Sequence, residues 1–331
     1  MNPAWGGQRA YGRSVRSRQT FGRPLNLMLR LAHVSDVHLF CPEARWVPED
    51  LLSRRLTGWL NMTLMRRGRK FRRAAEILAI LVDDIYERRA DGLIFSGDAT
   101  SLGFEEEFAL TASLLRLDAP DAIPTLAVPG NHDYYTRASA QQGLFERYFV
   151  KGLHGERIDA ATYPFARKIG PLWLIGVNSC TGNSWFWDAT GRVGDDQLKR
   201  LKQLLALPHI ASEPRILVTH FPIGLANGKP EKPWHKLRDL RPVLKAAHEA
   251  GVSLWLHGHR HHPYYLPATP ANPIPSICSG SGTQRKCWTY NEYQFDGEVW
   301  RVERRRFEPR RRRFQTVQSY YVEMAGLATV P

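Results

Sequence analysis

The chain has 331 residues, of which 43% are hydrophobic, and it carries a formal net charge of +14 at pH 7. A chain of this length can bury a full hydrophobic core in one or two domains. Because no apolar run reaches the roughly 18–20 residues that a membrane span needs, we do not expect an integral membrane protein. The four cysteines show no Cys-x-x-Cys spacing and are interpreted as free thiols in a reducing compartment.

The N-terminal segment is basic and contains no acid. The first 30 residues hold six Arg and lack an apolar core of 7–15 residues, so a secretory signal is not expected. An organelle transit peptide is one interpretation of such a segment. The simpler prediction is a disordered basic extension at residues 1–27, because Met28 stands directly before the first expected strand.

Short apolar runs and helical repeats alternate along the rest of the chain. In chain order, the patterns predict a strand at 29–34, a helix at 71–87, a strand at 93–95, a helix at 105–117 and strands at 124–128, 172–177 and 216–218. A helix at 240–250, a strand at 252–256 and short strands near 277, 288–295 and 300–307 follow. This alternation favours an α/β fold with helices outside a largely β core.

Five short polar motifs each follow one of the expected strands. They are Asp36-Val37-His38, Gly97-Asp98, Gly130-Asn131-His132-Asp133, Thr219-His220 and Gly258-His259-Arg260-His261. In layered α/β folds, ligands collect beyond the carboxyl ends of the strands, where all five motifs fall. Their carboxylate, amide and imidazole groups suffice for two divalent ions, and a metal pair about 3.5–4 Å apart can clamp an in-line displacement at phosphorus. The sequence therefore predicts a metal-dependent phosphoesterase with one catalytic domain.

This ordered set of motifs resembles the calcineurin-like metallophosphoesterases, over a stretch from about Leu29 to about Phe307. The resemblance implies an αββα sandwich of four layers, in which two mixed sheets are flanked by helices and a dinuclear metal site lies at the strand ends. We expect the catalytic domain at residues 28–310 and a C-terminal tail at 311–331.

Carried over residue by residue, the resemblance implies seven metal ligands. Asp36, His38, Asp98 and His261 would hold one ion, and Asp98 would bridge to a second ion held by Asn131, His220 and His259. A hydroxide activated by both metals would be the nucleophile. Manganese is the expected metal, with iron, zinc or cobalt as alternatives, because the same oxygen and nitrogen ligands accept several metals.

The remaining pair in the third motif is expected to be catalytic. The resemblance implies that His132 protonates or hydrogen-bonds the leaving oxygen and that Asp133 orients the His132 ring. Arg260 is expected either to face a substrate phosphate or to point into solvent, and His257 is expected to be structural. We assign no role to the other histidines, His33, His154, His209, His235, His248 and His262. One departure from many relatives is Ala99-Thr100-Ser101 after the second motif, where a further acid or Asn is common.

A basic amphipathic insert at residues 51–73 separates the first two motifs. Leu52, Leu56, Trp59 and Leu60 fall on one helical face, and eight Lys or Arg lie between residues 51 and 75. This composition is typical of a helix at a membrane surface, where each basic residue near an anionic leaflet contributes roughly 1 kcal/mol. The alternative is a helix that packs Leu56 and Trp59 onto the core, and a cap over the site would satisfy both interpretations.

The run Arg54-Arg55-Leu56-Thr57-Gly58-Trp59-Leu60-Asn61 resembles the insert of a bacterial subgroup of the family. Some members of that subgroup cleave the diphosphate of UDP-diacylglucosamine, a lipid A precursor, to UMP and an acylated sugar phosphate. We therefore expect a hydrolase of phosphate diesters or diphosphates, cytoplasmic or peripheral at the inner face of the cell membrane. The alternatives are a cyclic-nucleotide phosphodiesterase or a nuclease, whose binding would weaken with salt, and last a non-catalytic membrane scaffold.

Overall fold

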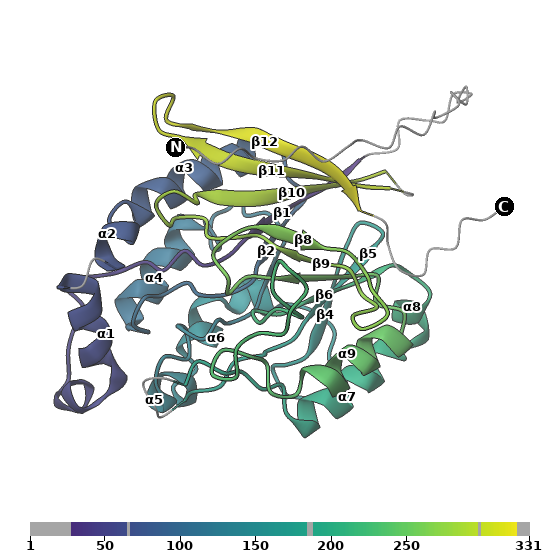
Figure 1. Cartoon of the computed structure of the whole chain (residues 1–331), viewed down its shortest axis with the longest axis horizontal. Helices are drawn as coiled ribbons and strands as arrows, with labels where there is room; N and C mark the ends of the chain where they lie inside the picture. The colour runs from purple at the N-terminus through teal and green to yellow at the C-terminus, as the bar shows by residue number, and fades with distance from the viewer. Residues whose placement is uncertain (1–27, 65–66, 184–187, 297–298, 323–331) are drawn as a thin grey trace, which may run out of the picture.

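The computed structural model describes residues 28–64, 67–183, 188–296 and 299–322 (Figure 1). The predicted basic extension at residues 1–27 lies outside this part of the chain. In order along the chain, the elements are β1 (Leu29–Val34), η1 (Pro48–Leu52), α1 (Arg54–Thr63), α2 (Arg67–Phe71), α3 (Ala74–Glu87), β2 (Gly92–Phe95), α4 (Glu105–Leu114), β3 (Thr125–Ala127), α5 (Arg137–Gln141), α6 (Leu144–Tyr148), η2 (Val150–Leu153), β4 (Phe165–Ile169), β5 (Leu172–Gly176), α7 (Asp195–Leu205), α8 (Pro208–Ala211), β6 (Arg215–Val218), α9 (Leu240–Glu249), β7 (Leu254–His257), β8 (Tyr264–Leu266), β9 (Ser276–Cys278), β10 (Thr289–Phe295), β11 (Trp300–Glu308) and β12 (Arg313–Val322).

The strands of the described residues form two mixed sheets, with the orders β12-β11-β10-β1-β2-β3 and β4-β5-β6-β7-β9-β8. In the first sheet β1, β2 and β3 are parallel, and β10, β11 and β12 are added in antiparallel fashion. In the second sheet β5, β6, β7 and β9 are parallel, with antiparallel β4 and β8 at the edges. Parallel neighbours end at the same edge of a sheet, so the loops after them lie together.

The two sheets pack face to face around one buried core. A Cβ on Gly92 of β2 would lie 2.7 Å from Cδ1 of Ile169 at the end of β4, which shows how closely the sheets approach. Helix α3 buries Ile77, Leu81 and Ile85 along one face, as its apolar spacing predicts. Figure 1 shows helices flanking the paired sheets, with α3 and α4 on one side and α7 and α9 on the other. The predicted αββα architecture is confirmed.

The C-terminal boundary differs from the prediction. Residues 313–322, expected to lie in a tail, form β12, which pairs with β11 along its length. Phe314 and Val322 are buried, and Nη2 of Arg305 on β11 donates to the carbonyl of Phe314 at 3.0 Å. The arginine-rich residues 309–312 form the turn between β11 and β12, and the sheet continues to Val322.

None of the helices in the described residues has both the length and the apolar character needed to cross a bilayer.

Candidate metal site and substrate pocket

All seven predicted ligands lie in loops that follow strands of the two sheets. Asp36 and His38 follow β1, Asp98 follows β2, Asn131 follows β3, His220 follows β6, and His259 and His261 follow β7. Five of them adopt positive φ angles: Asp36 (53°), His38 (45°), Asp98 (59°), His259 (68°) and His261 (58°). A left-handed conformation costs a residue with a side chain roughly 1–2 kcal/mol, and such strain gathers at functional sites. The surrounding structure therefore holds the ligand loops in conformations that residues with side chains rarely adopt.

The glycines of the motifs allow these loops to approach one another. A Cβ on Gly130 would lie 2.1 Å from Oδ1 of Asp98, and one on Gly258 would lie 1.9 Å from Oγ of Ser35. These distances are far inside van der Waals contact, so no larger residue fits without moving the loops. Gly130 and Gly258 are thus required by close packing of the ligand loops.

The first group of ligands is tightly clustered. One ligand atom from each of four residues lies within 4.8 Å of the others: Asp36, His38, Asp98 and His261. The Nε2 atoms of His38 and His261 are 3.1 Å apart. Ligands that bind one metal at about 2.1 Å lie roughly 3 Å from each other, so this spacing suits a shared ion.

The second group lies beside the first. Oδ1 of Asn131 is 3.1 Å from Nε2 of His220 and 3.0 Å from Nδ1 of His259. Oδ2 of Asp98 is 3.4 Å from Nε2 of His38 and 3.5 Å from Nε2 of His220. One carboxylate oxygen therefore stands between the two groups, where a bridging ligand for two ions belongs.

Asp36 provides a test of whether a metal fits. Its Oδ2 accepts a hydrogen bond of 3.0 Å from the backbone N–H of His259. Its Oδ1 is buried without a hydrogen-bond partner and lies 3.3 Å from Nε2 of His261. An unpaired buried carboxylate oxygen is costly, and a cation between Asp36 and His261 would satisfy it. The oxygen and nitrogen donors together fit two divalent transition-metal ions, which are borderline between hard and soft.

A contact between Nδ1 and an oxygen atom fixes the ring of three of the histidines. Nδ1 of His38 lies 3.1 Å from the carbonyl of Thr100, and Nδ1 of His220 lies 2.8 Å from the carbonyl of Ser96. Nδ1 of His261 lies 2.6 Å from Oε1 of Gln284. Since each acceptor is an oxygen, the proton resides on Nδ1, and Nε2 is left to bind a metal. Nothing in the sequence pattern pointed to Gln284, because it lies outside the five motifs.

The electrostatics of the cluster favour an ionised bridging carboxylate. Burial raises the pKa of Asp98, but the imidazoles of His220, His132 and His38 outweigh burial and hold this pKa well below its usual range. Burial lowers the pKa of His220, yet the neighbouring Asp98 carboxylate raises it to about 9. Burial also holds the pKa of His259 well below its ordinary value. Because ligands bind metals in their deprotonated forms, a metal bound at His220 would displace a proton from its ring.

His132 lines the pocket beside the bridging carboxylate, but its ring is oriented differently from the prediction. Nδ1 of His132 lies 2.8 Å from the carbonyl of Ser101, and its backbone N–H donates to Oδ1 of Asp98 at 2.7 Å. Asp133 was expected to orient this ring. Its carboxylate instead accepts from the backbone N–H groups of Asp98, Gly130 and Thr100, at 2.9, 2.8 and 3.1 Å. Asp133 thus ties the second motif to the third, and the Ser101 carbonyl orients the His132 ring.

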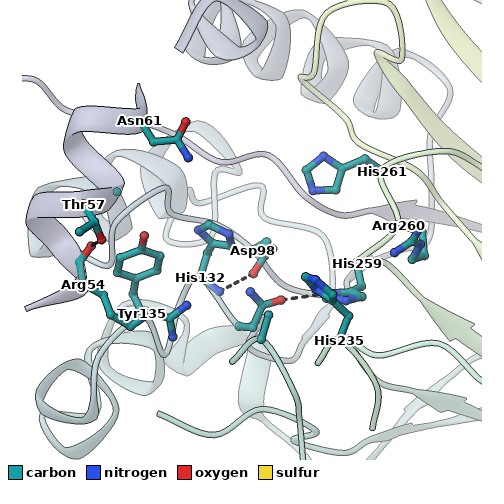
Figure 2. A pocket seen from close by; sticks show the side chains of 13 residues that line it. Arg54, Thr57, Asn61, Asp98, His132, Tyr135, His235, His259, Arg260 and His261 are labelled. Atoms are coloured by element: carbon teal, nitrogen blue, oxygen red, sulfur yellow. Dashed lines mark hydrogen bonds between the residues drawn. The ribbon is translucent and has the colours of Figure 1, made fainter. Parts of the chain in front are cut away.

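A pocket of about 640 Å³ opens over the ligands. Figure 2 shows Arg54, Thr57 and Asn61 of α1 on one side of it, and His259, His235 and Arg260 on the other. Arg260 was expected either to face substrate or to point into solvent. It lines the pocket, and its Nη1 lies 3.0 Å from Oε2 of Glu231. His235, to which we assigned no role, also lines the pocket, and no sequence signal distinguished it.

Residues 48–64, which include η1 and α1, form a cap beside this pocket. The side chain of Arg55 is buried within the cap and bonds to Oδ1 of Asp50 at 2.6 Å. It also donates to the carbonyls of Leu102 and Gly103 at 3.2 and 2.5 Å. The apolar repeat of the insert does not include Arg55, yet the side chain of Arg55 is buried. A buried arginine with this many acceptors anchors the cap to the loop after Asp98.

The cap rests on a small hydrophobic cluster separate from the main core. Trp59 is half-buried and packs edge-on against Trp46, with ring centroids 6.2 Å apart. A Cβ on Gly58 would lie 2.3 Å from Oη of Tyr135, so α1 sits directly on that ring. Leu52 and Leu64 remain 95% and 74% exposed. The cap thus packs Trp59 inward and leaves Leu52 and Leu64 on its outer side.

The fold and the site together define a layered α/β protein that carries a dinuclear site for divalent metals. Residues 29–263 match the family described as calcineurin-like phosphoesterase. The chain belongs to this family of phosphoesterase enzymes. A search of curated proteins found no match.

Solved structures with the same fold include two phosphatases. A dimetal phosphatase from Danio rerio is 12% identical, with a TM-score of 0.61, and the match covers 90% of this chain and 99% of that chain. A purple acid phosphatase from yellow lupin (Lupinus luteus) seeds is 13% identical, with a TM-score of 0.57, and the match covers 89% and 54%. At these identities the likeness shows the fold alone.

Proposed function

We propose that this chain hydrolyses phosphate diesters or diphosphates with the help of two divalent metal ions. The observation that carries the proposal is the position of Oδ2 of Asp98, 3.4 Å from His38 and 3.5 Å from His220. When bound, the two metals would polarise the phosphate and supply an activated water. The seven ligands remain a proposed set, with manganese as the expected metal.

His132 is the proposed donor to the leaving oxygen. Its ring lines the pocket next to Asp98, and the contact from Nδ1 to the carbonyl of Ser101 fixes the ring plane. A positioned imidazole contributes typically 10²–10⁴-fold to such a step. We expect His132→Ala to retain both metals and to slow turnover most for substrates with poor leaving groups. Equal slowing across leaving groups of widely different pKa would contradict this role.

The shape of the pocket supports a substrate with groups on both sides of the phosphorus. The pocket extends from the metal ligands toward Arg54 and Asn61 in one direction and toward His235 and Arg260 in the other. Burial lowers the pKa of Arg54, yet it stays cationic, and its guanidinium lies 5.0 Å from the centre of the Tyr135 ring. A cation at this point suits a second phosphate or another anionic group of the substrate.

The substrate we propose is a lipid-linked nucleotide sugar, such as UDP-diacylglucosamine, met at the inner face of the cell membrane. The insert that contains Arg54 and Asn61 resembles that of the subgroup with this activity. The exposed Leu52 and Leu64 on the outer side of the cap supply apolar contacts for acyl chains or a bilayer surface.

The test is UMP release from UDP-diacylglucosamine in detergent micelles with Mn²⁺. Asp98→Asn serves as the blank, and hydrolysis of bis(p-nitrophenyl) phosphate serves as a substrate-independent control. Metal-dependent release of UMP would support both the chemistry and the substrate. Hydrolysis of the small diester without UMP release would keep the chemistry and reject the lipid-linked substrate. Absence of both activities in metal-loaded protein would reject the proposed function.

A further inference from the structure

A second pocket, distinct from the catalytic one, is lined almost entirely by cationic side chains. It has a volume of about 610 Å³ and is formed by Arg69, Lys70, Arg72, Arg73, Arg285, Trp288 and Pro309. We call it the basic pocket. It shares no lining residue with the pocket over the metal ligands. Three stretches far apart in the sequence build it, namely α2 with its C-terminal end, the turn before β10, and the turn between β11 and β12 (Figure 1).

Most of the cations in the basic pocket have no acidic partner. Among the salt bridges of the described residues, Arg73 pairs with Glu76 at 2.7 Å, whereas none involves Arg69, Lys70, Arg72 or Arg285. These four side chains are exposed and lie next to one another at the pocket wall. Like charges held together without counterions destabilise a protein by mutual repulsion, so an anion in the basic pocket would relieve this cost.

A backbone hydrogen bond joins two of the stretches that build the basic pocket. The N–H of Arg285 donates to the carbonyl of Lys70 at 2.8 Å, which joins two of the stretches. Trp288 packs edge-on against Phe307 of β11, with ring centroids 5.6 Å apart. Its indole Nε1 is buried without a hydrogen-bond partner. Two of the stretches that build the pocket are therefore joined through their backbone, and one polar donor of the lining is unsatisfied.

Two side chains connect the basic pocket to the metal ligands. Phe71, between two of the pocket's cations, is buried with its ring centroid 5.0 Å from that of His38 and 6.0 Å from that of His261. Gln284, next to Arg285, contacts Nδ1 of His261 at 2.6 Å. An anion in the basic pocket would thus lie one layer of side chains away from the candidate metal site.

We propose that the basic pocket is a second anion site, which binds a phosphate group separate from the one that is hydrolysed. Arginine forks match phosphate oxygens in pairs of hydrogen bonds, and four unpaired cations exceed the charge of one phosphate. The phosphate would come either from the headgroup of an anionic lipid or from a soluble phosphate compound. This site goes beyond the proposed hydrolysis, which uses none of its residues.

The test compares three forms of the full, metal-loaded chain. They are the wild type, a triple variant Arg69→Glu, Arg72→Glu and Arg285→Glu, and a control triple variant Lys199→Glu, Lys202→Glu and Arg241→Glu. The control changes the same number of exposed cations, on α7 and α9. Two probes are used: vesicles of phosphatidylcholine with or without phosphatidylglycerol, measured by cosedimentation, and methylene diphosphonate, measured by calorimetry. The P–C–P link of methylene diphosphonate resists hydrolysis.

We expect the control to match the wild type and the first triple variant to lose at least about tenfold in binding to one probe, because each cation near an anionic surface adds to affinity. Selective loss of binding to phosphatidylglycerol vesicles would identify a lipid headgroup as the source. Loss of one of two diphosphonate sites would identify a soluble phosphate compound. Unchanged binding of both probes by the first triple variant would overturn the proposal. Hydrolysis of bis(p-nitrophenyl) phosphate by this variant should stay at the wild-type rate, which separates this result from any failure of the proposed function.

Discussion

The loops that carry the metal ligands and the cap over the pocket are held in place by different means. The ligand loops come from both sheets, are buried, and include five residues in strained left-handed conformations. The cap rests on a separate small cluster around Leu102, Phe104 and Tyr135 and is anchored by the buried side chain of Arg55. Several of its leucines face solvent.

This difference suggests that the ligand loops and the cap have different roles. Strained loops persist only where the surrounding structure fixes them, and the paired sheets supply that rigidity to the residues that perform the chemistry. The cap rests on its own small cluster, so we expect changes on its outer surface to leave the metal ligands in place. We infer that the ligand loops determine whether a phosphate is hydrolysed and that the cap determines which molecule carries that phosphate.

The largest effect is expected at the carboxylate shared by the two ligand groups. Asp98→Asn removes the negative charge that balances two cations, so hydrolysis of any substrate should fall by more than the 10–100-fold typical of changes around metal ligands, roughly 1,000-fold or more. Bound metal, measured by atomic emission after dialysis, should fall as well. Asp118→Asn, an exposed change near α4, is the control. Full activity of Asp98→Asn would remove the bridging role.

A smaller effect is expected at Gln284, which supports His261 from outside the ligand set. Gln284→Ala removes the acceptor 2.6 Å from Nδ1 of His261, so metal affinity or activity should fall about 10–100-fold. Gln284→Glu keeps an acceptor oxygen and should restore much of the loss. Gln203→Ala, on the exposed face of α7, should change nothing. If Gln284→Ala binds metal as tightly as the wild type, this contact has no role in orienting the ligand.

Changes in the cap should reduce activity on large substrates and leave activity on small substrates unaffected. In Gly58→Ala the new methyl group meets Oη of Tyr135 and Cδ2 of Leu102 at 2.3 and 2.6 Å, so α1 must shift. Overpacking of this kind costs about 1–3 kcal/mol of stability, and the shift of α1 moves Arg54 and Asn61, which line the pocket.

Kinetic measurements on two substrates check this prediction. The KM for a lipid-linked substrate should rise at least about fivefold, while hydrolysis of bis(p-nitrophenyl) phosphate stays near the wild-type rate. Ser113→Ala, an exposed small change in α4, controls for helix propensity. Equal losses on the small and the large substrate would mean that the cap also supports the metal ligands.

The ligand loops could be predicted closely from the sequence, whereas their supporting contacts could not. Asp36, Asp98 and His220 each follow a short apolar run, and parallel strands bring such residues to one edge of a sheet. The role of Asp133 was predicted wrongly, because a carboxylate next to His132 in the sequence suggests a partner for the ring. Its carboxylate instead accepts from the backbone N–H groups of Asp98, Thr100 and Gly130, and no spacing rule reveals a backbone donor.

The cap shows a second limit of the sequence pattern. A helical repeat of Leu52, Leu56, Trp59 and Leu60 predicts one apolar face but not its partner. The structure turns Trp59 toward Trp46, leaves Leu52 exposed and buries Arg55. The charge of Arg55 suggested solvent, but Asp50 and two backbone carbonyls compensate it in the interior. Such long-range compensation lies outside any local pattern.

The smallest effect on the protein itself is expected at the outer leucines of the cap, where the proposed contact with lipid is tested most directly. Leu52 and Leu64 are 95% and 74% exposed, so replacing both with Ser should change the free energy of unfolding by less than about 0.5 kcal/mol per site. Leu56 and Trp59 are unsuitable for this test because they are half-buried.

If the cap meets acyl chains, the Leu52→Ser and Leu64→Ser variant should bind micellar substrate and vesicles more weakly, because a fully buried Leu side chain contributes about 1.5–3 kcal/mol. Its hydrolysis of a small soluble diester should stay unchanged. Val299→Ser and Val317→Ser, at 41% and 49% exposed and outside the cap, form the control pair. Equal binding by both pairs and the wild type would leave the cap as a wall of the pocket without contact to lipid. The substrate would then be sought among soluble phosphate diesters and diphosphates.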